Sequence, residues 1–123
     1  MTEFLLVAAG GAVGASARYA VTLLLRPVSG GFPWHTLGVN IAGSFLLGLL
    51  VAVLPEGDAG ERLRLLLGVG VLGGFTTFSA FSVDALTLAQ QDQWLTAAVY
   101  AVGSVAAALA GAAAGYAAGR ALA

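Results

Sequence analysis

The sequence predicts an all-α membrane protein with four transmembrane helices. Hydrophobic residues make up 59% of the 123 residues, charged residues only 9%, and the mean hydropathy is +0.95. A soluble domain carries about a quarter charged residues, so this chain has too few to cover a water-exposed surface. The apolar residues also gather in four stretches, each close to the roughly 20 residues that a helix needs to cross bilayer hydrocarbon.

The four expected spans fill most of the chain. They cover about residues 4–25, 36–54, 63–89 and 95–119, and short polar connections at 26–35, 55–61 and 90–93 separate them. Little sequence remains for a soluble domain. Residues 1–123 are therefore interpreted as a single four-helix transmembrane unit, multi-pass in the cell membrane and in contact with the lipid bilayer.

The composition excludes several classes of function. Without Cys there is no disulfide framework, zinc–thiolate site or cysteine nucleophile. A formal net charge of −1, with no Lys, argues against binding of nucleic acid. His35 is the only imidazole, and no paired carboxylates lie inside the spans. We therefore expect that the chain is not an enzyme.

The arginines are divided almost evenly between the two ends of the spans. Arg62, Arg64 and Arg120 belong to one side, and Arg26 belongs to the other, with Arg18 inside the first span nearer to Arg26. Lys and Arg near span ends set the orientation of a membrane protein. So small a difference permits insertion in both directions, and hence an antiparallel homodimer.

Polar side chains at membrane depth are candidate functional groups, because burying them in lipid is costly. Asn40 lies one turn inside the second span. Its amide either binds a ligand or makes a hydrogen bond between helices. Arg18 is either a cation that extends to the membrane surface or one that attracts anions into an aqueous vestibule.

The third span has the least regular helical sequence, Gly-Gly-Phe-Thr-Thr at residues 73–77. Paired glycines and threonines are poor helix formers, so this stretch predicts a break that frees backbone carbonyls to line a cavity. A glycine kink satisfied by Thr hydroxyls is the alternative. Phe78 and Phe81 are three residues apart and face the same side if the helix resumes. Their positive ring edges suit an anion, although simple packing also explains the pair.

Small residues recur at every fourth position of the fourth span, and this pattern favours close approach of helix backbones. The positions are Gly103, Ala107, Gly111, Gly115 and Gly119.

Three motifs together resemble the CrcB/Fluc family of fluoride channels. Residues 73–82, GGFTTFSAFS, are similar to the GGxTTFSTFS signature of that family. Residues 36–48, TLGVNIAGSFLLG, resemble its TLxxNxxGxFxxG motif, and residues 10–19, GGAVGASARY, its GGxxGxxxR motif. Tyr100 and Ser104 match polar positions of its fourth span. The resemblance covers the whole chain in order.

The resemblance implies a fluoride-selective channel that exports F⁻ passively and so lowers cytoplasmic fluoride. It also implies a dual-topology homodimer of antiparallel subunits, each with a mid-membrane break in its third helix, and a structural Na⁺ on the dimer axis. By matching position, the backbone carbonyls of Gly73 and Thr76 would bind Na⁺. The residues along the fluoride path would be Asn40, Phe78, Phe81, Thr77, Tyr100 and Ser104, with Arg18 near the vestibule.

Three positions depart from the family pattern. His35 stands where a Gly is usual, and can make conduction sensitive to pH. Ala80 replaces a Thr and removes a hydroxyl, and Asp84 replaces a Glu and shortens an acid near the end of the pore.

A small dual-topology exporter of drugs or other cations is the main alternative, and a purely structural membrane subunit is another. Proton-coupled export of cations needs a carboxylate within the first span. Glu3 precedes that span, and Asp84, the only acid at depth, lies late in the third. Anion efflux without coupling would favour the channel, and uptake of a lipophilic cation in exchange for protons would favour the exporter.

Overall fold

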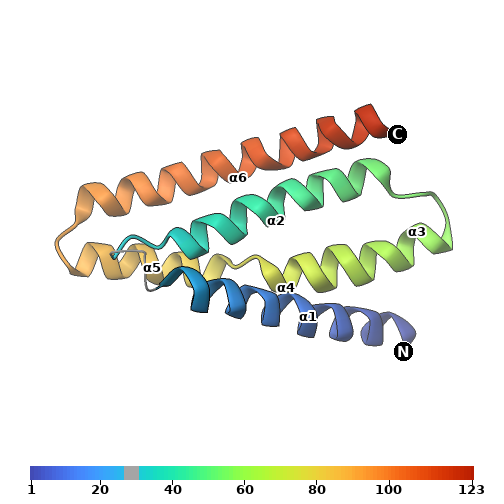
Figure 1. Ribbon diagram of the computed structural model, residues 1–123, viewed down its shortest axis with the longest axis horizontal. Coiled ribbons are helices and arrows are strands. Elements are labelled where there is room, and N and C mark those ends of the chain that lie inside the picture. Colours follow the sequence, from blue (N-terminus) through green and yellow to red (C-terminus); the bar gives the residue numbers. More distant parts are fainter. Residues whose placement is uncertain (27–30) are drawn as a thin grey trace.

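The computed structural model describes residues 1–26 and 31–123, and these form an all-helical chain (Figure 1). Within this part, four helices are long and apolar enough to cross a membrane: Thr2–Leu25, Trp34–Val53, Asp58–Gln90 and Trp94–Leu122. The prediction of four apolar helices suited to membrane spans is confirmed. The expected connection at 26–35 includes residues 27–30, which lie outside the described residues.

Three of the four spans are continuous helices, namely α1 (Thr2–Leu25), α2 (Trp34–Val53) and α6 (Trp94–Leu122). The remaining span is divided into α3 (Asp58–Leu63), the π-helical segment η2 (Arg64–Leu72), α4 (Gly73–Phe75) and α5 (Phe78–Gln90). This span starts at Asp58, earlier than the expected residue 63, because the first turn of α3 is acidic. Acidic side chains stabilise a helix N-terminus, but a hydropathy profile does not count them as part of a span.

The helices pack mainly as two pairs, α2 along α6 and α1 along η2. In Figure 1 both chain termini lie at the same end of the molecule. Glycines permit this close packing: a Cβ on Gly115 of α6 would overlap the carbonyl oxygen of Phe45 on α2, and one on Gly14 of α1 would overlap that of Val71. The small residues of the fourth span therefore do bring backbones together, although Gly103, at the start of the row, meets no atom within 4 Å.

The outer surface of the bundle is apolar. Leu24 is 75% exposed, Leu95 is 78% exposed, and the core that a single chain buries is a small cluster around Leu88, Ala97 and Tyr100. A water-soluble domain buries most of its large apolar side chains. Lipid or another protein surface must therefore cover the apolar outer surface of this bundle.

Candidate functional site

The third span is interrupted at two threonines. Thr76 and Thr77 have extended backbone angles (φ −80°, ψ 158° and φ −152°, ψ 121°), whereas residues 73–75 are helical. The interruption thus follows the glycine pair instead of containing it. β-Branched Thr favours extended backbone, and the Thr77 side chain also caps α5, since its Oγ1 accepts a hydrogen bond of 3.0 Å from the N–H of Ala80.

The glycine pair has a packing role. A Cβ on Gly74 would lie 2.8 Å from the carbonyl oxygen of Gly11 on α1, closer than real Cβ contacts. The sequence motif thus joins two separate functions, namely close approach of α1 at the glycines and an extended turn at the threonines.

Asn40 on α2 forms hydrogen bonds with the interrupted segment through both polar atoms of its side-chain amide. Its Oδ1 accepts from the N–H of Thr77 at 2.8 Å, and its Nδ2 donates to the carbonyl of Thr77 at 2.9 Å. Of the two roles that the sequence leaves open for Asn40, the hydrogen bond to another span is therefore present. An amide Nδ2 carries two hydrogens, and within the described chain only one of them has a partner.

Several backbone carbonyls near the interruption lose their helical donors. In a continuous α-helix the N–H of residue i donates to the carbonyl of residue i−4. The N–H of Thr77, which would serve Gly73, donates to Asn40 instead, and the N–H of Ala80, which would serve Thr76, donates to the Thr77 hydroxyl. The carbonyls of Gly73 and Thr76 are therefore left to other partners.

Arg18 of α1 also contacts this segment. Its Nε donates to the carbonyl of Gly74 at 3.1 Å, from a half-buried position. This carbonyl is the one that the N–H of Phe78 would serve in a continuous helix. Side chains from α1 and α2 thus both bind the third span at or next to its interruption. Residue spacing does not predict the Arg18 contact.

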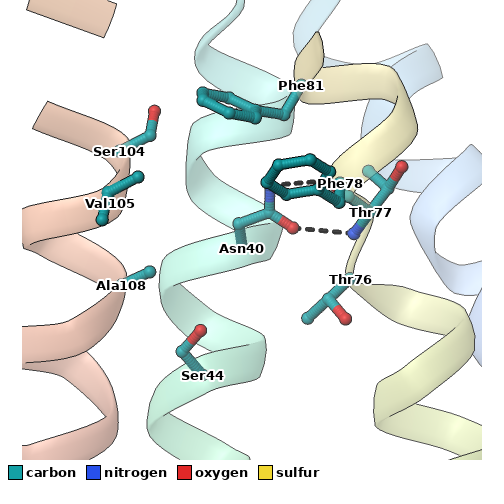
Figure 2. A pocket seen from close by; sticks show the side chains of 9 residues that line it. All are labelled: Asn40, Ser44, Thr76, Thr77, Phe78, Phe81, Ser104, Val105 and Ala108. Atoms are coloured by element: carbon teal, nitrogen blue, oxygen red, sulfur yellow. Dashed lines mark hydrogen bonds between the residues drawn. The ribbon is translucent and has the colours of Figure 1, made fainter. Parts of the chain in front are cut away.

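Beside Asn40 lies a cavity of about 220 Å³, which Figure 2 shows in close-up. Helices α2 and α6 and the interrupted span contribute its walls. Its lining includes Asn40, Ser44, Thr76, Thr77, Phe78, Phe81 and Ser104. Ser104 is 6% exposed, and its hydroxyl has no hydrogen-bond partner in the described chain.

Aromatic rings form one end of this cavity. The centroids of Phe78 and Phe81 are 5.5 Å apart, as the sequence spacing predicts for two rings on one side of α5. Phe81 in turn lies 5.2 Å from the ring of Tyr100, which is buried. Phe78, in contrast, is 77% exposed, so one wall of the cavity is open at the surface of a single chain.

A family model described as "CrcB-like protein, Camphor Resistance (CrcB)" matches residues 5–116. The chain belongs to the CrcB family. A relative from Paracoccus denitrificans, named fluoride-specific ion channel FluC, is 49% identical over 97% of this chain and 95% of its own length.

Two further relatives are also named fluoride-specific ion channel FluC. The one from Novosphingobium aromaticivorans is 47% identical over 90% of both chains, and the one from Thermus thermophilus is 49% identical over 85% of both. The resemblance seen in the sequence motifs is therefore confirmed. As a CrcB member with four apolar helices, this chain is a multi-pass cell-membrane protein.

The CrcB fold brings most of the expected path residues together, but not all of them. Asn40, Thr77, Phe78, Phe81 and Ser104 line the cavity beside Asn40. Tyr100 does not line it, and neither does Arg18, which was expected near the vestibule and not on the path itself.

The hydroxyl of Tyr100 instead donates to Asp84 at 3.2 Å, and its ring supports Phe81. Ser44 lines the cavity without having been expected there. The signal that could have identified it is its position one turn after Asn40 on the same stripe of α2.

Proposed function

We propose that this chain is a subunit of a fluoride-selective channel, through which F⁻ leaves the cell passively. The observation that carries the proposal is the lining of the cavity beside Asn40: it combines neutral hydrogen-bond donors with aromatic rings, and none of its described lining residues is charged. Relatives named fluoride-specific ion channels support it.

The chemistry of this lining suits fluoride. Fluoride is small and strongly hydrated, so a pore must replace its water with donors, yet must bind it weakly enough for the ion to leave. Asn40 offers its second N–H and Ser104 its unpartnered hydroxyl. The rings of Phe78 and Phe81 can turn their positive edges to an anion. A buried Lys or Arg at the same place would hold the ion too tightly.

The functional unit is an antiparallel, dual-topology homodimer. One wall of the cavity is open where Phe78 is exposed, and an ion surrounded on one side by lipid would lack partners. A second copy would close that wall. The nearly even division of Arg between the two ends supports insertion in both orientations, and the interrupted third helix would then lie near the middle of the bilayer.

A structural Na⁺ on the dimer axis is part of the proposal. The carbonyls of Gly73 and Thr76 have lost their helical donors, and hard cations prefer oxygen ligands of this kind. Two carbonyls from each of two subunits would supply four oxygens. The ion would provide a fixed positive charge that stabilises the break and the subunit pair.

Proton-coupled cation export, the alternative function, is not favoured. The relatives of this chain are named fluoride-specific ion channels, and the one deep carboxylate, Asp84, accepts a hydrogen bond from Tyr100. It does not line the cavity beside Asn40.

Fluoride efflux from liposomes tests the proposed function. Purified protein is reconstituted into vesicles loaded with KF, and valinomycin is added to carry the compensating K⁺. We expect rapid release of fluoride to an electrode, and almost no release of chloride from matched vesicles loaded with KCl. Equal release of both anions, or release of neither, would contradict the proposal.

A further inference from the structure

A second and more polar pocket, of about 280 Å³, lies between α1, α2 and α5. We call it the arginine pocket, and its lining includes Arg18, Arg26, His35, Thr36, Thr77 and Asp84. Thr77 lines both this pocket and the cavity beside Asn40. The two spaces therefore adjoin at Thr77 of the interrupted segment.

His35 is the residue of this pocket that can change its charge near neutral pH. It lies in the first turn of α2 (Trp34–Val53), and its Nδ1 is buried without a hydrogen-bond partner in the described chain. Histidine is the one side chain whose ordinary titration range falls between pH 5 and 8. His35 also lines the arginine pocket, so its imidazole lies beside the polar groups of that pocket, with one ring nitrogen that has no partner among the described residues.

Charged and titratable groups from the neighbouring elements line the same pocket as His35. They are Arg18 and Tyr19 of α1, Arg26 directly after α1, and Asp84 of α5. Tyr100 of α6 donates to Asp84 and so contributes indirectly. The arginines outnumber the carboxylate, and the pocket is therefore positive even when the imidazole is neutral.

We propose that His35 makes the entry of anions through the arginine pocket depend on protons, so that fluoride flux rises as the pH falls. This proposal rests on the proposed channel function. A protonated imidazole adds one positive charge beside the path of the anion. The added charge attracts anions from solution, and water in the open pocket screens it. An increase in flux of about threefold is expected from one added charge in a partly hydrated site.

Fluoride efflux from liposomes at pH 8 and pH 6, with the same pH on both sides, tests this proposal. Protein-free vesicles at each pH correct for leakage of neutral HF. The original protein should conduct about threefold faster at pH 6 than at pH 8, and the difference should shrink in high concentrations of impermeant salt. His35→Gln, which cannot gain the charge, should give the same flux at both pH values.

Two further variants serve as controls. His35→Gly provides a second neutral replacement in case Gln disturbs α2, and it should also remove the pH dependence. Asp84→Asn lowers the negative charge of the same pocket but leaves His35 in place. It should keep the rise in flux between pH 8 and pH 6. A pH dependence that persists in both His35 variants would overturn the proposal.

Anion binding near His35 can also be measured without conduction. The chain contains a single His, so protein labelled only in histidine gives one imidazole signal by NMR. Binding of anions and protons is reciprocal; fluoride should therefore move the midpoint of the His35 titration to higher pH than a sulfate solution of matched ionic strength.

The two measurements separate the inference from the proposed function. If the protein releases no fluoride at any pH, the channel function fails. The NMR titration then still decides whether His35 and anions interact. A midpoint that fluoride leaves unchanged would overturn the proposal even in a protein that conducts fluoride well.

Discussion

The side-chain amide of Asn40 takes the place of a helical neighbour for Thr77, with Oδ1 2.8 Å from its N–H nitrogen and Nδ2 2.9 Å from its carbonyl oxygen. This pairing has two consequences. It satisfies both polar groups of an extended residue, which would be costly to leave unpaired away from water. It also fixes the Asn40 side chain so that its remaining N–H is held at the edge of the cavity.

Asn40→Asp should abolish most of the fluoride flux. A carboxylate has no hydrogen to donate to the Thr77 carbonyl or to an anion, and its charge repels fluoride. We expect flux below about one tenth of the original, because an unpaired buried carbonyl alone costs about 1–3 kcal/mol. Liposome efflux measures the loss, and size-exclusion chromatography should show the same elution volume as for the original protein. Normal flux from a correctly folded variant would place the pore elsewhere.

The features that local sequence determines were predicted well. Four apolar spans follow from hydropathy, and the extended residues Thr76 and Thr77 follow from β-branched side chains in a row, whereas the glycine pair before them stays helical. The contacts that hold the interruption could not be predicted in this way. Arg18 and Gly74 are 56 residues apart and Asn40 and Thr77 are 37 apart; one sequence carries no signal for such pairs.

The length of its side chain explains why Tyr100, unlike Ser104, does not line the cavity beside Asn40. Tyr100 and Ser104 are one turn apart and share a helix face, yet only Ser104 lines the cavity beside Asn40. The Tyr side chain is longer and reaches Asp84 on α5. Residue spacing predicts a shared face, but it does not predict which neighbour a long side chain meets.

Gly43→Ala should impair flux by displacing Thr76. A Cβ at this position of α2 would overlap Cγ2 of Thr76. Thr76 cannot turn away freely, because its hydroxyl donates to the carbonyl of Leu72 at 3.0 Å. Overpacking of this kind costs about 1–3 kcal/mol, and we expect flux to fall about tenfold in the liposome assay.

A second substitution at Thr76 checks the cause of this loss. Thr76→Ser removes Cγ2 and keeps the hydroxyl, so the double variant Gly43→Ala/Thr76→Ser should regain most of the flux. Gly38→Ala on the same helix is the matched control, since nothing lies within 4 Å of its added Cβ. If Gly43→Ala conducts normally, Thr76 does not need its present position.

Gly115→Ala should destabilise the subunit. Its Cβ would overlap the carbonyl oxygen of Phe45, which belongs to the backbone of α2 and cannot rotate away. We expect a loss of about 1–3 kcal/mol in the free energy of unfolding, measured by denaturation in detergent. Gly103→Ala, whose Cβ meets no atom within 4 Å, should show no such loss. Equal stability of the two variants would contradict the packing of α2 against α6.

Added positive charge near the C-terminus tests the proposed dual topology. Two or three Lys placed after Ala123 join Arg120 on one side of the membrane and should bias insertion. Expressed alone, the biased chain should lose activity, because no oppositely oriented partner is present. Activity should return on co-expression with a copy biased the other way. A chain shown to insert in one direction only, yet fully active, would exclude antiparallel pairing.

Removal of Na⁺ should slowly inactivate the channel. The carbonyls of Gly73 and Thr76 have lost their helical donors to Asn40 and to the Thr77 hydroxyl, and an unpaired carbonyl in hydrocarbon costs several kcal/mol. If Na⁺ satisfies them, exchanging it on both sides for a large organic cation over hours should reduce both fluoride flux and the thermal stability of the dimer.

Both properties should recover when Na⁺ returns, and no Na⁺ should cross the membrane with fluoride, because a structural ion stays in place during conduction. The rate of the loss is informative in itself. An ion held between two subunits leaves only when they separate or open, so inactivation should follow dimer opening and be far slower than ion conduction. Flux and dimer stability that remain constant through prolonged removal of Na⁺ would mean that water or side chains satisfy Gly73 and Thr76.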